Sequence, residues 1–125
     1  MHSYVVRPRL DKSGKVEVVR YYGIPVTSGQ VTIDDLAEEI SHSSSLTRGD
    51  ILATVSALNE AIQKHLEDGK TVYIKGIGLF YISATGEGCQ TSEECTPSKV
   101  RANRICFKAD NWMKRVLKRI RFKRA

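Results

Sequence analysis

The chain has 125 residues, of which 41% are hydrophobic and 27% are charged, an ordinary balance for one globular domain with a modest core. Its formal net charge of +6 favours an anionic partner. No apolar run approaches the about 18 residues of a membrane-spanning helix, and three cysteines without a secretory segment argue against a disulfide framework. We therefore expect a cytoplasmic protein.

Basic residues are concentrated toward the two ends of the chain. Residues 99–125 carry eleven Lys and Arg against one acidic residue, and residues 1–26 carry five against two. Residues 27–98 carry eleven acidic residues against four basic ones. This distribution predicts a nucleic-acid-binding surface, whereas the plainer interpretation of the C-terminal surplus is a solvated basic tail.

Two runs rich in Val and Tyr, residues 4–9 and 16–22, are typical of β-strands. The Asp-Lys-Ser-Gly sequence between them predicts a turn and thus a β-hairpin, and Pro8 favours an edge position in the first strand. Residues 23–30 are expected to form a loop. We predict an N-terminal β extension over residues 1–30, followed by the main part of the domain over residues 31–125.

Two amphipathic helices are predicted next. Thr32 and Thr47 each precede an Asp by three residues, which is the spacing of a capping box. The second helix carries a long apolar stripe from Ile51 to Leu66 and stops at Asp68-Gly69. Because this stripe is wide for a short domain, we expect it to pack against a partner subunit as well as its own.

The apolar period then changes from about 3.6 to 2. Residues 71–74 and 79–82 are predicted strands on either side of a Gly-Ile-Gly turn, and residues 100–108 are a third. The polar residues 85–98 between them are expected to protrude. Asp110 should cap a final amphipathic helix that reaches Ile120, and residues 121–125 should be frayed.

These elements, in this order, resemble the HU/IHF family of bacterial histone-like proteins. The family's Gly-Phe-Gly-x-Phe signature stands here as Gly76 to Phe80, and its Asn-x-Pro-x-Phe stands as Asn103 to Phe107. The first 30 residues resemble the extension of longer HU-related proteins typical of the Bacteroidetes. The resemblance implies an α+β fold that forms an intertwined homodimer. Each subunit would have two N-terminal helices, a three-stranded antiparallel sheet with a protruding β-ribbon arm and a C-terminal helix, to which this chain adds the hairpin.

The resemblance also implies a function without catalysis. Family members bind duplex DNA with low sequence specificity, through phosphate contacts and bending, in the nucleoid. No cofactor, metal, small-molecule substrate or membrane is expected. Where two subunits interlock, the resemblance points to the apolar residues Ile77, Phe80 and Phe107.

The arm departs from the family pattern. It carries Glu87, Glu93 and Glu94 and no Lys or Arg before Lys99, and carboxylates beside phosphates would be repelled. Its single proline, Pro97, lies in Thr-Pro-Ser and not in the Arg-Asn-Pro of the family. Pro97 is thus a candidate intercalating wedge or a simple turn proline, and wrapping of DNA by this arm is in question.

DNA contact is therefore expected on the third strand and the final helix. Strand alternation puts positions 99 and 101 on one face and 104 on the other. Helical spacing puts positions 114, 118 and 121 on one face, with 115 and 119 beside them. The basic residues expected to contact DNA are Lys99, Arg101, Arg104, Lys108, Lys114, Arg115, Lys118, Arg119 and Arg121.

Other functions remain open at this stage. The acidic arm and the hairpin could serve an HU-like scaffold that binds proteins without DNA. The charge alone does not distinguish RNA from DNA, and a basic amphipathic helix could lie on an anionic membrane. An enzyme is disfavoured because His2, His42 and His65 are scattered without the spacing of a metal or general-base site.

Overall fold

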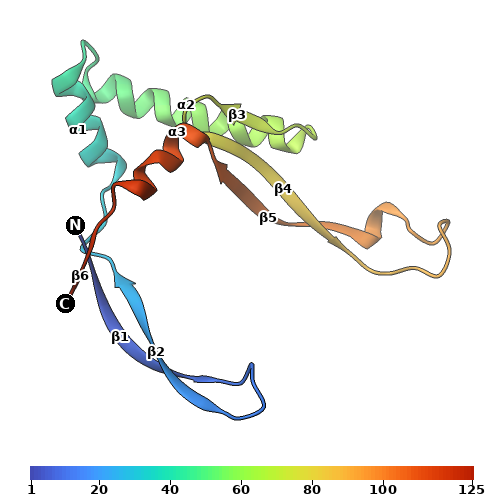
Figure 1. Cartoon of the computed structure of the whole chain (residues 1–125). Helices are drawn as coiled ribbons and strands as arrows, with labels where there is room; N and C mark the ends of the chain where they lie inside the picture. Colours follow the sequence, from blue (N-terminus) through green and yellow to red (C-terminus); the bar gives the residue numbers. More distant parts are fainter.

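Two β ribbons project from a small helical body in the computed structural model, which describes all residues 1–125 (Figure 1). The elements in chain order are β1 (His2–Asp11), β2 (Val18–Val26), α1 (Ile33–Ser43), α2 (Arg48–Glu67), β3 (Val72–Ile74), β4 (Gly78–Gly86), the 3₁₀ helix η1 (Pro97–Lys99), β5 (Val100–Ala109), α3 (Asn111–Lys114), the 3₁₀ helix η2 (Arg115–Lys118) and β6 (Phe122–Arg124). The fold is mixed α+β, with two three-stranded sheets. None of its helices is long and apolar enough to cross a membrane.

The first sheet joins the two ends of the chain in the order β2-β1-β6. The hairpin prediction is confirmed, but β2 continues to Val26, where a loop was expected. Strand β6 pairs in parallel with the start of β1, which places His2 beside Phe122 at a ring separation of 5.5 Å. Because β6 reaches only as far as Tyr4, β1 has a free edge at Pro8, where a proline without an N–H is tolerated.

Both helix starts follow the prediction. In α1 and α2 the cap threonine accepts a hydrogen bond from the backbone of the third helical residue, whose carboxylate accepts one from the cap N–H. Each capping box thus satisfies two backbone N–H groups that the helix leaves free. Helix α2 ends at the predicted Asp-Gly, where Gly69 has a positive φ of 81°.

The prediction for the final helix was wrong both in the length of the helix and in the structure that follows it. Its α-helical part is only α3, four residues long, and the next four tighten into η2. The residues expected to be frayed instead form β6, because β1 offers them a hydrogen-bonding edge. The N–H of His2 donates to the carbonyl of Arg121 at 2.7 Å, and that of Ala125 donates to the carbonyl of Tyr4 at 2.9 Å. The apolar side chains of this segment are not buried, since Trp112 is 67% exposed and Leu117 is 66% exposed.

The second sheet, in the order β3-β4-β5, contains the predicted Gly-Ile-Gly turn and the protruding β4–β5 ribbon. Gly76 needs its positive φ of 85° to make the turn. Gly78 has no room for a side chain, because a Cβ there would overlap the carbonyl oxygen of Lys108 and would lie 2.6 Å from the Phe107 ring. Phe107 in turn packs on Phe80 with ring centroids 5.0 Å apart.

The chain has almost no core of its own. Its only buried side chains are those of Ala37, Ile51 and Leu66. The chain exposes 10823 Å² of surface, whereas a compact protein of the same mass exposes about 6,700 Å². The helices and ribbons are therefore not packed against one another as they are in a compact monomer.

We predict that Gly78→Ala destabilises the fold by about 1–3 kcal/mol, since the added methyl group must displace the β5 backbone and a phenylalanine ring. Chemical denaturation monitored by circular dichroism measures this loss. Gly88→Ala is the matched control, because nothing lies within 4 Å of a Cβ at that position. Equal stability of the two variants would contradict the close approach at Gly78.

Candidate nucleic-acid interface

A bulge in the β4–β5 ribbon decides where its basic side chains point. Ala102 pairs with Ala84, and Arg104 pairs with the adjacent Ser83, which leaves Asn103 as an extra residue on β5. The Ser83 hydroxyl lies 3.0 Å from the Asn103 side-chain oxygen, to which it donates. Because the extra residue reverses the alternation of β5, the arginines on either side of the bulge lie on the same face.

The expected arrangement of these basic residues is thus wrong in two respects. Arg101 pairs with Thr85 and Arg104 with Ser83, and positions 83 and 85 of β4 share a face, so Arg104 does not point away from Arg101. Lys108 lies on the same face as Arg104 by strand alternation. Lys99 lies in η1 and not in the strand, so strand alternation does not apply to it.

The opposite face of the ribbon is apolar. It carries Phe80 and Ile82 from β4 and Ala102, Ile105 and Phe107 from β5. Several of these side chains line a groove against α2, together with Ile62 and Leu66. Ile105 is 69% exposed. The ribbon therefore separates a cationic face from an apolar face that nothing in the subunit fully covers.

The turns that follow β5 carry the second group of predicted cations. Lys114 lies in α3, Arg115 and Lys118 lie in η2, and Arg119 caps the end of η2. The guanidinium of Arg115 lies 5.9 Å from the centre of the Trp112 ring. Arg121 follows η2, so the helical face expected to contain positions 114, 118 and 121 does not exist. Arg119 and Arg121 instead line a cleft beside Met1 and His2.

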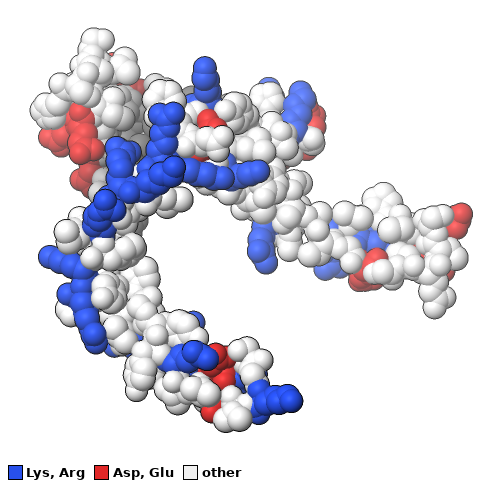
Figure 2. Space-filling model, viewed as in Figure 1, with Lys and Arg blue, Asp and Glu red and all other residues white.

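In the view of Figure 2, Lys and Arg form a band that runs from the region of α3 along β6 and onto the β1–β2 ribbon. Acidic residues gather on the side of α1 and toward the ends of both ribbons. The charge separation seen along the sequence is thus also a separation in space.

The loop at the end of the β4–β5 ribbon is not cationic. The ammonium group of Lys99 lies 3.2 Å from the Glu87 carboxylate, so this predicted DNA contact is partly neutralised. Pro97 begins η1, where its missing N–H costs nothing, and it lies beside the start of β5 and not at the tip of the loop. Cys89 and Cys95 lie in the same loop as free thiols.

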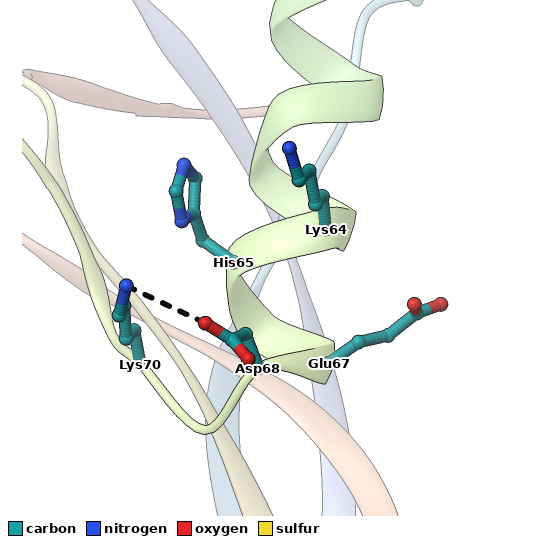
Figure 3. Close-up of a pocket in the computed structure, with 5 residues that line it drawn as sticks. All are labelled: Lys64, His65, Glu67, Asp68 and Lys70. Carbon is teal, nitrogen blue, oxygen red and sulfur yellow. Dashed lines mark ion pairs between the residues drawn. The ribbon is translucent and has the colours of Figure 1, made fainter.

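A shallow pocket at the end of α2 is lined by both basic and acidic side chains (Figure 3). Lys70 and Asp68 form an ion pair of 3.4 Å, and Glu67 points away from it. Lys64 and His65 complete the lining. Because cations and carboxylates alternate here, the pocket is a poorer match to an anionic ligand than the surface near α3.

Asp110, predicted only as a helix cap, holds the base of the ribbon together. Its carboxylate accepts hydrogen bonds from the Gly76 N–H at 2.7 Å, the Tyr73 hydroxyl at 2.9 Å and the Asn111 N–H at 2.8 Å. These bonds, the one from Gly76 most of all, lower the pKa of Asp110 below its usual value, and the bond to Asp110 raises the pKa of Tyr73. The N–H of Asp110 also donates to the Ile77 carbonyl at 2.9 Å.

Sequence reasoning missed three features of this surface. The bulge at Asn103 leaves no mark in the composition of β5. The double role of Asp110 requires knowing that Gly76 lies beside it, 34 positions away in the chain. Lys123 and Arg124 were assigned to a frayed end, because the short segment Phe122-Lys123-Arg124 follows other basic residues and has no strand pattern of its own.

Comparison with known proteins identifies the family of this chain. Residues 2–124 match the family described as an HU domain fused to a winged helix-turn-helix, Ig or glycine-rich motif. This chain belongs to that HU-related family. It is 30% identical to the DNA-binding protein HU of Streptococcus mutans serotype c over 89 residues, which are 67% of this chain and 94% of the relative.

A solved structure supports the fold alone. A crystal structure from Bacteroides vulgatus ATCC 8482, described as a proposed bacterial DNA-binding protein, superposes with a TM-score of 0.65 at 11% sequence identity. The similarity covers 96% of this chain and 47% of the other, so the chain spans about half the length of that structure. The N-terminal sheet is included in a match of this extent.

We predict that Asp110→Asn lowers stability at neutral pH, because the ionised carboxylate is the stronger acceptor for Gly76 and Tyr73. The folded-state pKa of Asp110 is depressed, so its stabilisation is present above the ordinary pKa of an aspartate and is lost as the pH falls through the folded-state pKa. Urea denaturation at neutral and acidic pH should show the gap between variant and parent closing in acid. Glu39→Gln removes a carboxylate without a hydrogen bond and should open no such gap; a pH-independent loss in Asp110→Asn would contradict this role.

Proposed function

We propose that this protein is an architectural, nucleoid-associated protein that binds duplex DNA with low sequence specificity as a homodimer and bends it. The observation that carries the proposal is the separation of the β4–β5 ribbon into two faces. Arg101, Arg104 and Lys108 share one face, and the apolar groove lies on the other. A subunit with this ribbon can pair through the apolar face while the cationic face remains available to phosphates.

The dimer is supported by the missing core. The isolated subunit exposes roughly 4,000 Å² more than a compact protein of its size. Part of this excess belongs to ribbons that extend into solvent, but homodimer interfaces of about 2,000–5,000 Å² are common. A second copy would cover the groove lined by Ile62, Leu66 and Ile105, together with the half-exposed ring of Phe107. Ile77 and Phe80 are proposed to lie at the same interface.

Low specificity follows from the kind of element that carries the charge. Phosphate contacts position a protein on DNA, whereas sequence is read by side chains placed on base edges in a groove. Helices α1 and α2 are acidic in their first turns, and α3 is four residues long, so none of them is suited to major-groove reading. The basic residues lie on a ribbon and on tight turns, as expected for binding through the DNA backbone.

Bending would arise from two such ribbons on one duplex, because contacts on both sides of a dimer are gained when the DNA curves toward them. The acidic residues near the ribbon loop oppose deep wrapping. Intercalation by Pro97 stays a prediction, and comparison of the bend made by the parent and by Pro97→Ala tests it.

The dimer is tested by placing a charge in the apolar groove. Ile105→Glu should convert the dimer into monomer or destabilise it, since a buried carboxylate without a partner is costly. Sedimentation equilibrium measures the change. Thr85→Glu, on the opposite face of the same ribbon, is the control and should remain dimeric. A dimeric Ile105→Glu protein would exclude this groove as the interface.

DNA binding is tested by a salt series with a fluorescent duplex. About six neutralised phosphates give a slope near −5 for the logarithm of the association constant against the logarithm of salt concentration. Replacing Arg101, Arg104 and Lys108 together by Gln should make that slope shallower by about one for each phosphate contact that is lost, and should weaken binding to all sequences alike. Replacing Lys114, Arg115, Lys118 and Arg119 together should have a similar effect.

The control for both sets is Lys64→Gln combined with Lys70→Gln, which removes charge from the mixed pocket of Figure 3. A folded dimer that binds no duplex even at low salt would overturn the proposal. It would leave an HU-like scaffold that acts in protein interaction. Preference for RNA over DNA in the same series would reassign the partner.

A further inference from the structure

The N-terminal sheet carries basic side chains that the proposed interface does not use. Cross-strand pairs in its ladder show which of them share a face. Arg7 pairs with Tyr22, Arg9 pairs with Arg20, and Lys123 of β6 pairs with Ser3, all on the same side of the sheet. The other side carries Tyr4, Val6, Pro8 and Leu10 of β1. Arg124 of β6 also lies on this second side, and Val5 and Ile24 lie on the first. The side with Arg7, Arg9 and Lys123, which we call the cationic face, thus holds most but not all of the basic side chains of the sheet.

The cations on this face are free of carboxylate partners, with one exception. Asp11 and Glu17 are the only acidic residues of the first 33, and both lie at the turn end of the hairpin. Asp11 pairs with Arg20. Arg7, Arg9 and Lys123 form no ion pair, so their charge is available to an anion.

The cationic face continues into the surface already described. The cleft between the N-terminus and the end of η2 is lined by His2, Arg119 and Arg121. Figure 2 shows the band of Lys and Arg passing this junction onto the β1–β2 ribbon. A positively charged surface that spans two elements suits an extended polyanion, because the charges of the polyanion are spaced along a line.

The dimensions also fit a duplex. The basic positions of this face, from Ser3 opposite Lys123 to Arg9, extend over about 20 Å of strand, which is the length of several phosphates along one strand of B-DNA. Ring faces near the basic residues, such as that of Tyr22, add surface that can pack against sugar groups. A small anion would use only one end of such a surface.

We infer that the N-terminal sheet is a second DNA-contacting arm, in which Arg7, Arg9 and Lys123 bind phosphates that flank the segment held by the β4–β5 ribbon. This inference rests on the proposed function, since it extends the same duplex beyond the first ribbon. The arm contacts backbone only, so it lengthens the site without adding sequence preference. Because the β4–β5 loop is acidic, the N-terminal arm supplies the outer contacts that this loop cannot.

The test compares Arg7→Gln/Arg9→Gln with the matched double variant Lys64→Gln/Lys70→Gln. In the salt series, the first should make the slope shallower by about one for each phosphate contact that is lost and weaken binding about tenfold or more at 0.1 M salt, and the second should leave both unchanged. Hydroxyl-radical footprinting on a long duplex should show that Arg7→Gln/Arg9→Gln loses the outermost protected positions and keeps the central ones. Thermal denaturation verifies that both variants fold.

The outcomes separate the two proposals. If the parent protein binds no duplex, the proposed function fails. If the parent binds and Arg7→Gln/Arg9→Gln gives the same slope and footprint as the control, only the second arm is excluded. If the double variant changes the mass in sedimentation equilibrium and not the footprint, the sheet contacts a second copy of the chain and the inference is overturned.

Discussion

The carboxylate of Asp110 is the contact on which the arrangement of the binding surface depends. It ties the turn before β4, through Gly76, to the first residue of α3, and it does so at the point where β5 leaves the sheet. Without the carboxylate, the base of the β4–β5 ribbon and the turn after it would lose three hydrogen bonds, and the backbone bond from Asp110 to Ile77 would remain. Asp110 is also the single acidic residue among eleven basic ones after position 98. One negative charge is thus used to hold a strongly positive segment in a defined shape.

The bulge at Asn103 has a comparable effect on a smaller scale. A regular strand would divide Arg101 and Arg104 between two faces and would bring a guanidinium into the apolar groove. One extra residue restores the separation, because every side chain beyond it changes face. The same shift aligns Ile105 and Phe107 with Phe80 and Ile82. Both surfaces of the ribbon, the cationic one and the apolar one, therefore depend on the same local irregularity.

Local signals explain what could be predicted from the sequence. The capping boxes at Thr32 and Thr47 involve residues only three positions apart, so the starts of α1 and α2 were predicted correctly. The Gly-Ile-Gly sequence likewise indicates the turn between two strands. The end of the final helix was predicted wrongly, because residues 122–124 pair with the start of β1, more than a hundred positions away. The free edge of β1 competes with helix formation for these residues. The faces of Arg101 and Arg104 were wrong for the same reason: register is a property of two strands, and one strand's sequence does not contain it.

The pairing of β6 with β1 has a consequence for how the protein folds. It brings His2 beside Phe122, 120 positions further along the chain, and closing so long a loop costs more entropy than closing a local turn. Contacts of this kind form after local ones, so the helices and the β4–β5 ribbon should assemble before the N-terminal sheet is complete. Strand β6, which has only three residues, should therefore pair late in folding and separate early in unfolding. Local unfolding of β6 would release both chain ends at once while the rest of the chain stays folded.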